Sequence, residues 1–570
     1  MASNAEATPA APPQLGLWDA VSIIIGIVIG TSIYVTPSII NGHLHSPTEV
    51  MVLWTVGGVL CLIGALCYAE LGTAYPRMGG DYVYLTKAFG PWFGFQFGWA
   101  QLAVILTASI GMMGFAFGDY AVKLMGLSES EAAPVIKVVL AVLAVGGLTA
   151  VNIMGVVMGK HTQNVLSLTK VIGLGGIIVA GLVYGKPDGA WVASKATESV
   201  PSYGVALILV LYAYGGWNDA AFVAAEMRNK RQIPTTLLLG TGGVMIIYLL
   251  INAAYIQALG FQATQGFNPS PIAARSAGVM GEWAAKSISL LVMISALGAI
   301  NGLLFTGSRV CSALGTEYSL FASLGRWHPK FGSPVWSLSA MAAIAIAMIL
   351  GVGTEIGQGL IDSALGTMHI GPMPWKKYFG GFDTLFAGTA PVFWFFFLLT
   401  GLALFVLREN DKATRRPFLV PLYPYTPTIF CAMCLFGLYS ALDYAGLVSL
   451  IGIVPLLIGV PLYAVSRYRP QLAEGEQPAA EPKSETPPWL AEQPAAPPVP
   501  AAPPPSEPAA PTETPAAAPA PVASSPLASA TAPLPATTDF IPLPSAPVPV
   551  SPTSEEPEPP PEENPFASFK

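Results

Sequence analysis

Residues 26–37, which read GIVIGTSIYVTP, constrain the fold of this chain more than any other feature. They lie inside an otherwise apolar segment, Leu15–Ile40, that is long enough to span a bilayer. Glycine, threonine, serine and proline form helices poorly, and each backbone group left unpaired in lipid costs several kcal/mol. We therefore expect this interruption only where it lines a cavity inside the protein.

A second apolar segment, Leu207–Ala225, is interrupted in the same way and reads LILVLYAYGGWNDAAFVAA. Gly215, Gly216 and Asn218 lie near its middle. Two broken spans in corresponding positions indicate a transporter binding site. The pattern predicts an alternating-access carrier whose substrate lies between the two breaks.

Composition predicts an all-α polytopic membrane protein. Of the 570 residues, 53% are hydrophobic and only 10% are charged, whereas a soluble protein carries far more charge. Residues 1–14 are polar and lack the basic region of a signal peptide, so we expect a disordered N-terminus followed by a retained first span. Twelve spans are expected, at about residues 17–40, 50–74, 91–121, 134–154, 162–185, 203–225, 235–259, 283–314, 334–352, 383–407, 423–445 and 447–466.

The net charge of −7 belongs to the C-terminal tail. Residues 470–570 are rich in Pro and Ala and carry about −11, which leaves about +4 on the rest of the chain. Such a tail cannot bury a core and is expected to be disordered. The acidity is no evidence of a basic substrate, and nothing resembles a nucleic-acid surface.

Basic residues are distributed unevenly between alternate loops. Arg77, Lys160, Arg228 and Arg408 fall in loops on one side, with several further basic residues. The positive-inside rule then places both termini, including the tail, in the cytoplasm of a cell (plasma or inner) membrane. The same topology places the loop of residues 353–382 outside, either as a partly ordered cap or as a passive spacer.

Four motifs, in order, resemble the amino acid, polyamine and organocation transporters, with the L-type amino acid transporters as the most similar branch. They are residues 26–37, residues 64–85 (GALCYAELGTAYPRMGGDYVYL), residues 213–234 (AYGGWNDAAFVAAEMRNKRQIP) and residues 298–310 (GAINGLLFTGSRV). The resemblance covers residues 15–468. It implies a LeuT-type fold with inverted five-helix repeats at about residues 15–185 and 203–407, and two extra helices at about 423–466.

The breaks suit the charged head of an amino acid. A broken helix exposes free N–H groups at the start of its second half and free carbonyls at the end of its first half. The substrate carboxylate is then expected at Gly30, Thr31, Ser32 and Ile33, and its ammonium at Ile27, Tyr212, Ala213 and Gly215.

The resemblance also implies an aromatic gate at Tyr212, although a membrane-core aromatic is the alternative. Trp217 and Asn218 follow the second break, and Asn218 is expected to brace it. Ile105 and Ser109 in the third span are expected to line the side-chain pocket. An Arg-Pro pair common in animal members is replaced here by Leu-Thr, which leaves the pocket shape open.

Lys170 lies well inside the fifth span, where an ionisable residue costs at least about 2.5 kcal/mol and is a functional candidate by default. In related carriers such a lysine reaches the first and eighth spans, where sodium-coupled relatives bind an ion. Ser295 of the eighth span remains, but Ala299 offers no hydroxyl. Two mechanisms stay open, a permanent positive brace in a sodium-independent exchanger or a titrating group in a proton symporter; snorkelling to the interface is the structural alternative.

Most acidic residues near the spans are expected to have structural roles. Glu70 and Asp81 are expected to be inner-face scaffold residues that pair with Arg77 or neighbouring loops, and Glu226 and Arg228 have the same interpretation. Asp219, beside the second break, either faces solvent or selects a positive side chain. Because no other acidic residue adjoins the breaks, neutral L-amino acids are the expected substrates.

Several function classes are disfavoured. Neither the five cysteines nor the histidines form a metal, redox or catalytic motif, so no metal, cofactor or enzyme activity is expected. The resemblance implies that animal members of this branch pair with a glycoprotein, the heavy chain, through a cysteine in an outer loop. No cysteine falls in an outer loop here, so no disulfide-linked heavy chain is expected. Two dissimilar broken helices do not suggest a channel filter. A membrane sensor that binds amino acids without moving them remains possible.

Overall fold

The computed structural model describes residues 15–185, 190–193, 203–265, 272–277, 282–367, 369, 371–375 and 381–468. These residues form helices joined by short connections, and only isolated β-bridges occur among them. The predicted all-α class is confirmed. The predictions for residues 1–14 and for the tail from residue 470 fall outside the described residues.

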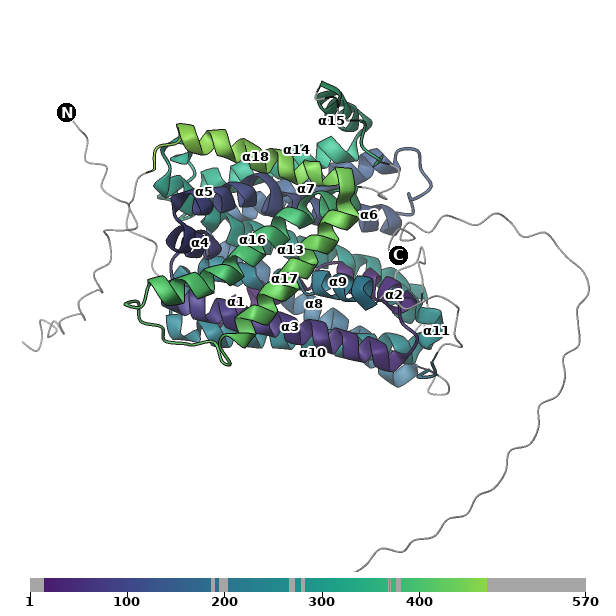
Figure 1. Cartoon of the computed structure of the whole chain (residues 1–570). Coiled ribbons are helices and arrows are strands. Elements are labelled where there is room, and N and C mark those ends of the chain that lie inside the picture. The colour runs from purple at the N-terminus through teal and green to yellow at the C-terminus, as the bar shows by residue number, and fades with distance from the viewer. Residues whose placement is uncertain are drawn as a thin grey trace, which may run out of the picture. The chain divides into compact units, whose positions relative to one another are not determined.

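Long apolar helices form the bundle in Figure 1. They are α3 (Pro47–Ala74), α7 (Ala133–Ile153), α8 (Val156–Tyr184), α10 (Ile233–Leu259), α13 (Glu282–Glu317), α14 (Val335–Gly353), α16 (Gly381–Asn410), α17 (Tyr425–Ala445) and α18 (Leu450–Val465), with one continuous span built from α5 (Pro91–Ala100), η1 (Gln101–Ile105) and α6 (Leu106–Leu124). Shorter elements are α4 (Asp81–Phe89), η3 (Lys230–Gln232), α11 (Phe261–Thr264), α12 (Ile272–Ala277), η5 (Ser319–Phe321) and α15 (Glu355–Thr367).

The number of spans depends on how interrupted helices are counted. Among the described residues, 10 helices are long and apolar enough to cross a membrane, or 11 if the bent α1–α2 pair is one span. That count treats residues 425–465 as a single stretch, although the turn η7 (Gly446–Ser449) separates α17 from α18. The arrangement fits a LeuT-type fold, and the number twelve stays a prediction.

Both predicted interruptions are present. The first span consists of α1 (Leu17–Val28) and α2 (Ser32–Gly42), which are bent by 50° at the break. The second consists of α9 (Tyr203–Ala213), a turn, and the 3₁₀ helix η2 (Trp217–Glu226). Gly216 in the turn has a φ of 103°, and a Cβ there would lie 2.6 Å from the Ile27 side chain. Glycine thus allows the two breaks to touch.

The first break is enclosed by protein. Helix α1 packs against α8, α10 and α13, and the residues flanking its end, Val28 and Ile29, are buried. Irregular backbone at membrane depth is stable only in such surroundings, where polar partners or a cavity replace lipid.

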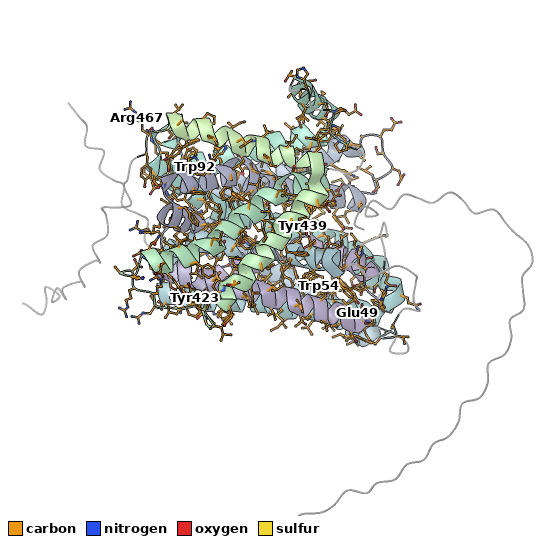
Figure 2. The ribbon with its side chains drawn as sticks, in the orientation of Figure 1. Glu49, Trp54, Trp92, Tyr423, Tyr439 and Arg467 are labelled. Carbon is orange, nitrogen blue, oxygen red and sulfur yellow. The ribbon has the colours of Figure 1, made fainter. Side chains whose placement is uncertain are left out.

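The outside of the bundle is apolar. Figure 2 shows the charged residues Glu49 and Arg467 at opposite ends of the bundle, with Tyr439 between them. Large apolar side chains on the helices are exposed, including Leu143, Ile172 and Leu435. An apolar belt of this kind fits a lipid bilayer. The chain is a multi-pass membrane protein.

The predicted outer loop of residues 353–382 contains helix α15, which stands apart from the main bundle in Figure 1. The Asp362 carboxylate accepts hydrogen bonds from the Met373 backbone N–H at 2.9 Å and from Trp375 Nε1 at 2.8 Å. These hydrogen bonds tie α15 to the segment that follows it, and the choice between a cap and a spacer stays a prediction.

Candidate functional site

A cavity lies between the two breaks. Its wall combines residues from both broken spans with side chains from η1, α6, α13 and α16. Of the residues predicted for the substrate site, those on the wall are Ile27, Gly30, Thr31, Ser32, Ile105, Ser109, Tyr212, Gly215 and Asn218. Ile33, Ala213 and Trp217 are not on the wall and are buried.

The start of α2 supplies uncommitted donors. Among the described residues, no backbone carbonyl accepts from the N–H groups of Thr31, Ser32 or Ile33. The Gly30 N–H differs, because it donates to the Val28 carbonyl at 2.7 Å. The predicted set of four donors is thus corrected to three in this conformation. Orphan N–H groups at a helix start favour an anion.

The acceptors at the end of α1 and in the second break are only partly free. Within the described residues, no hydrogen bond reaches the carbonyls of Ile27 and Gly215, and both residues line the cavity. The Tyr212 carbonyl already accepts from the Gly215 N–H at 3.0 Å. The prediction that Ala213 binds the ammonium is wrong for this conformation. The Ala213 carbonyl accepts from the Tyr248 hydroxyl at 3.1 Å, and the residue does not line the cavity.

An aromatic pair lines part of the cavity. The Tyr212 and Phe386 rings have centroids 4.2 Å apart, and both residues line the wall. Trp217, predicted at the gate or pocket, instead points into the core, where its ring contacts Tyr68 at a centroid distance of 5.1 Å. This is a correction, because Trp217, the first residue of η2, packs behind the break rather than at the cavity.

Lys170 lies at the centre of α8 and is fully buried. Lys170 Nζ donates to the Gly26 carbonyl at 2.6 Å and to the Ile29 carbonyl at 2.8 Å. In the described structure neither carbonyl receives a backbone N–H, because the α1 ladder ends there. The lysine therefore satisfies the negative end of the first half-helix, and snorkelling to the interface does not occur.

The eighth span holds the same break from α13. The Ser295 hydroxyl lies 2.9 Å from both the Ile29 and the Gly30 carbonyl oxygens. Ala299, one turn further, lines the cavity and offers no oxygen. Lys170 and Ser295 thus meet at Ile29, as the resemblance implied.

The start of α1 is fastened at the predicted cytoplasmic end. The Leu15 N–H donates to the Glu226 carbonyl and the Arg228 N–H donates to the Leu15 carbonyl, each at 3.0 Å. The Asp19 carboxylate also pairs with Lys160 of α8 at 3.3 Å. These contacts hold the start of α1 against η2, the segment after it and α8.

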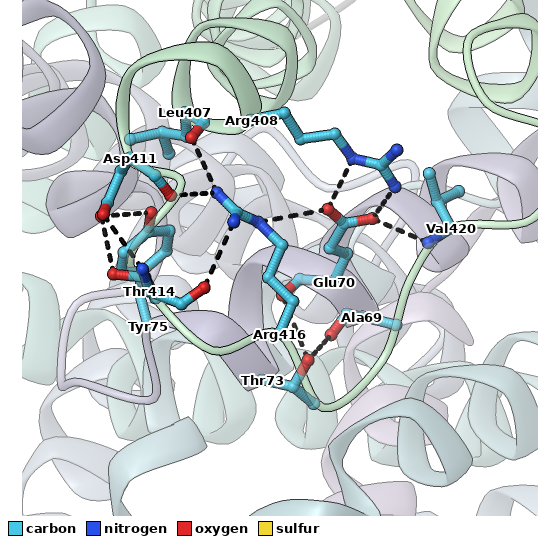
Figure 3. A network of polar contacts seen from close by, with 10 residues as sticks. All are labelled: Ala69, Glu70, Thr73, Tyr75, Leu407, Arg408, Asp411, Thr414, Arg416 and Val420. Atoms are coloured by element: carbon cyan, nitrogen blue, oxygen red, sulfur yellow. Dashed lines mark hydrogen bonds and ion pairs between the residues drawn. The ribbon is translucent and has the colours of Figure 1, made fainter.

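A buried charge network near the same end joins α3 to α16 and its following loop (Figure 3). The fully buried Glu70 carboxylate pairs with Arg408 and lies 3.6 Å from Arg416, and it accepts from the Val420 N–H at 2.7 Å. Glu70 is thus a scaffold residue, and it pairs with Arg408 in the last turn of α16 and with Arg416 of the following loop.

Asp411 completes this network outside the spans. Partial burial raises its pKa, but hydrogen bonds from Thr414 and Tyr75 outweigh that effect and leave the pKa below its usual range. The Asp411 carboxylate therefore stays charged at neutral pH.

Sequence reasoning missed several wall residues. Gln101 lies in the five-residue π-helix η1, while Phe386 and Thr389 come from α16. A π-helix is common at functional sites but leaves no composition signal. Asp219, considered from the sequence as facing either solvent or substrate, lies on the wall.

Comparison with known proteins then identifies the family. A family model described as amino acid permease matches residues 15–457. The chain belongs to the amino acid permease family. It is 30% identical to the serine/threonine exchanger SteT of Bacillus subtilis over 79% of this chain and 96% of the relative. It is also 30% identical to the mouse b(0,+)-type amino acid transporter 1 over 74% of this chain and 81% of the relative, and 29% identical to the human cystine/glutamate transporter over 79% and 84%. The predicted superfamily is confirmed, and the family consists of transporters rather than enzymes.

Proposed function

We propose that this permease moves neutral L-amino acids across the cell membrane by alternating access, as a sodium-independent exchanger or facilitator. The observation that carries the proposal is one cavity lined by uncommitted peptide groups from two broken helices. Its similarity to an exchanger of serine and threonine supports exchange.

The head of the substrate would bind to the backbone. The N–H groups of Thr31 and Ser32, which line the cavity, would hold the carboxylate at the positive end of α2. The carbonyls of Ile27 and Gly215 would accept from the ammonium. Because these are main-chain groups, binding of the head would be independent of the substrate's side chain.

Sodium independence is proposed from Lys170. Carbonyl oxygens are typical ligands for small hard cations, and here the Lys170 ammonium occupies those of Gly26 and Ile29. A fixed positive charge at this point would replace a bound sodium ion. Proton symport is the second candidate, since the same buried ammonium could exchange its proton in another conformation.

Alternating access would open one end of the cavity at a time. For inward opening, the backbone hydrogen bonds of Leu15 and the Asp19–Lys160 ion pair would break and free the start of α1. For outward opening, the Tyr212 and Phe386 rings would separate. No disulfide-linked heavy chain is proposed, because all five cysteines lie within α3, α13 and α17.

Counterflow in proteoliposomes tests this function. Purified protein is reconstituted, loaded inside with unlabelled amino acid, and supplied outside with a panel of labelled neutral amino acids at two pH values, with and without sodium. We expect internal substrate to accelerate uptake, with no sodium requirement. Binding without counterflow would indicate a sensor, and uptake driven by an imposed proton gradient would indicate a symporter.

A further inference from the structure

Asp219 is the charged side chain on the cavity wall, within the described part of the chain. It is only 7% exposed and belongs to η2, just beyond the second break. A carboxylate in this position is costly unless a cation or hydrogen-bond donors compensate it.

The protein supplies little compensation. Asn218 Nδ2 donates to Asp219 at 3.2 Å. The charged neighbour of Asp219 is another carboxylate, Asp81, which accepts from the Tyr68 and Thr400 hydroxyls. Among the described residues, no lysine or arginine pairs with Asp219 or Asp81. This side of the cavity therefore holds two buried acidic side chains without a basic partner among the described residues.

Two further acceptors on the wall lack donors. Asn218 Oδ1 and Gln101 Oε1 are buried and receive no hydrogen bond, and both residues are 4% exposed. Buried acceptors are normally satisfied, and each unsatisfied one costs about 1–3 kcal/mol. Together with the carboxylate they make a surface that is complementary to a donor-rich, positively charged group.

We propose that Asp219, Asn218 and Gln101 form a side-chain subsite for amino acids that end in a cationic nitrogen. The proposal rests on the proposed function and widens its substrate class from neutral to basic amino acids. Asp219 lies three residues after Gly216 in 3₁₀-type backbone, which places it about 6 Å further along the helix axis than the second break. A four-carbon side chain such as that of lysine suits this reach when the substrate head lies at the breaks. Neutral side chains would instead contact the apolar wall near Ile105 and Phe386.

The test compares lysine with norleucine, which has the same carbon chain without the ammonium. Each is used to compete with a labelled neutral amino acid in counterflow by the reconstituted full-length protein. We expect wild-type protein to accept both. In Asp219→Asn, the lysine-to-norleucine ratio of apparent affinities should fall by at least about tenfold, because the neutral amide leaves the ammonium without its counter-charge. Asp119→Asn, at an exposed ion pair with Lys137, is the matched control and should keep the wild-type ratio.

The outcomes separate this subsite from the proposed function. If norleucine is exchanged but lysine neither competes nor is exchanged by wild-type protein, the subsite is refuted while the carrier function stands. If neither is exchanged, nor any other amino acid, the proposed function itself fails. If the lysine-to-norleucine ratio is unchanged in Asp219→Asn but the pH dependence of exchange is altered, Asp219 binds and releases a proton rather than the substrate's cationic group. That result would overturn the proposal. Rejection of lysine by wild-type protein would refute the subsite even if the variant does not fold.

Discussion

Replacing Lys170 by alanine removes two hydrogen bonds to the first break. Its two charge-assisted hydrogen bonds, to Gly26 and Ile29, contribute about 1.5–3 kcal/mol each. Desolvation of the ammonium offsets part of this sum. A remaining difference of only about 3 kcal/mol between two access states would shift their populations by more than about 100-fold.

Counterflow in proteoliposomes measures the consequence. We expect Lys170→Ala to lower the exchange rate by at least about tenfold, or to uncouple it. Lys137→Ala is the control, because that lysine forms an exposed pair worth about 0–1 kcal/mol and should leave exchange within about twofold of wild type. Full exchange by Lys170→Ala with unchanged pH dependence would refute the role assigned to this residue.

Three further substitutions test the surroundings of the site. Gly298→Ala would place a methyl group 2.7 Å from Lys170 Cε, so we expect slower exchange and a loss of about 1–3 kcal/mol in stability; Gly175→Ala, with open space around it, should show neither effect in the same transport and thermal-unfolding assays. Tyr212→Ala should weaken apparent substrate affinity and raise leak in the absence of internal substrate, whereas Tyr212→Phe should retain the ring contact and most activity; equal behaviour of the two variants would argue against a gate. Glu70→Gln leaves two arginines without their buried counter-charge, and the expected loss of about 3–5 kcal/mol should appear as a lower midpoint of thermal unfolding; an unchanged midpoint would show that the network does not stabilise the fold.

The helices and both breaks could be predicted from the sequence because their causes are local. Apolar segments of bilayer length become helices in lipid, and clustered Gly, Thr and Ser residues interrupt them. Even the reach of Lys170 to the first span was foreseeable, although from family resemblance rather than from spacing.

The misplaced residues depend on local geometry and on distant partners. Trp217, the first residue of the 3₁₀ helix η2, packs into the core, while its neighbours Asn218 and Asp219 reach the wall, and the composition of this segment does not reveal that division. The Ala213 carbonyl is taken by a tyrosine of another span. Glu70 meets Arg408, which is 338 residues away in sequence, and no local pattern reports such a pair.

The central claim is that peptide groups of two broken helices bind both charged ends of an amino acid. It is tested most directly by competition in counterflow, with one neutral amino acid compared with its methyl ester, which lacks the carboxylate, and its N-acetyl derivative, which lacks the ammonium. The account predicts that only the parent amino acid competes effectively, because each derivative leaves one set of backbone groups unpaired. Competition by either derivative with the affinity of the parent would contradict it.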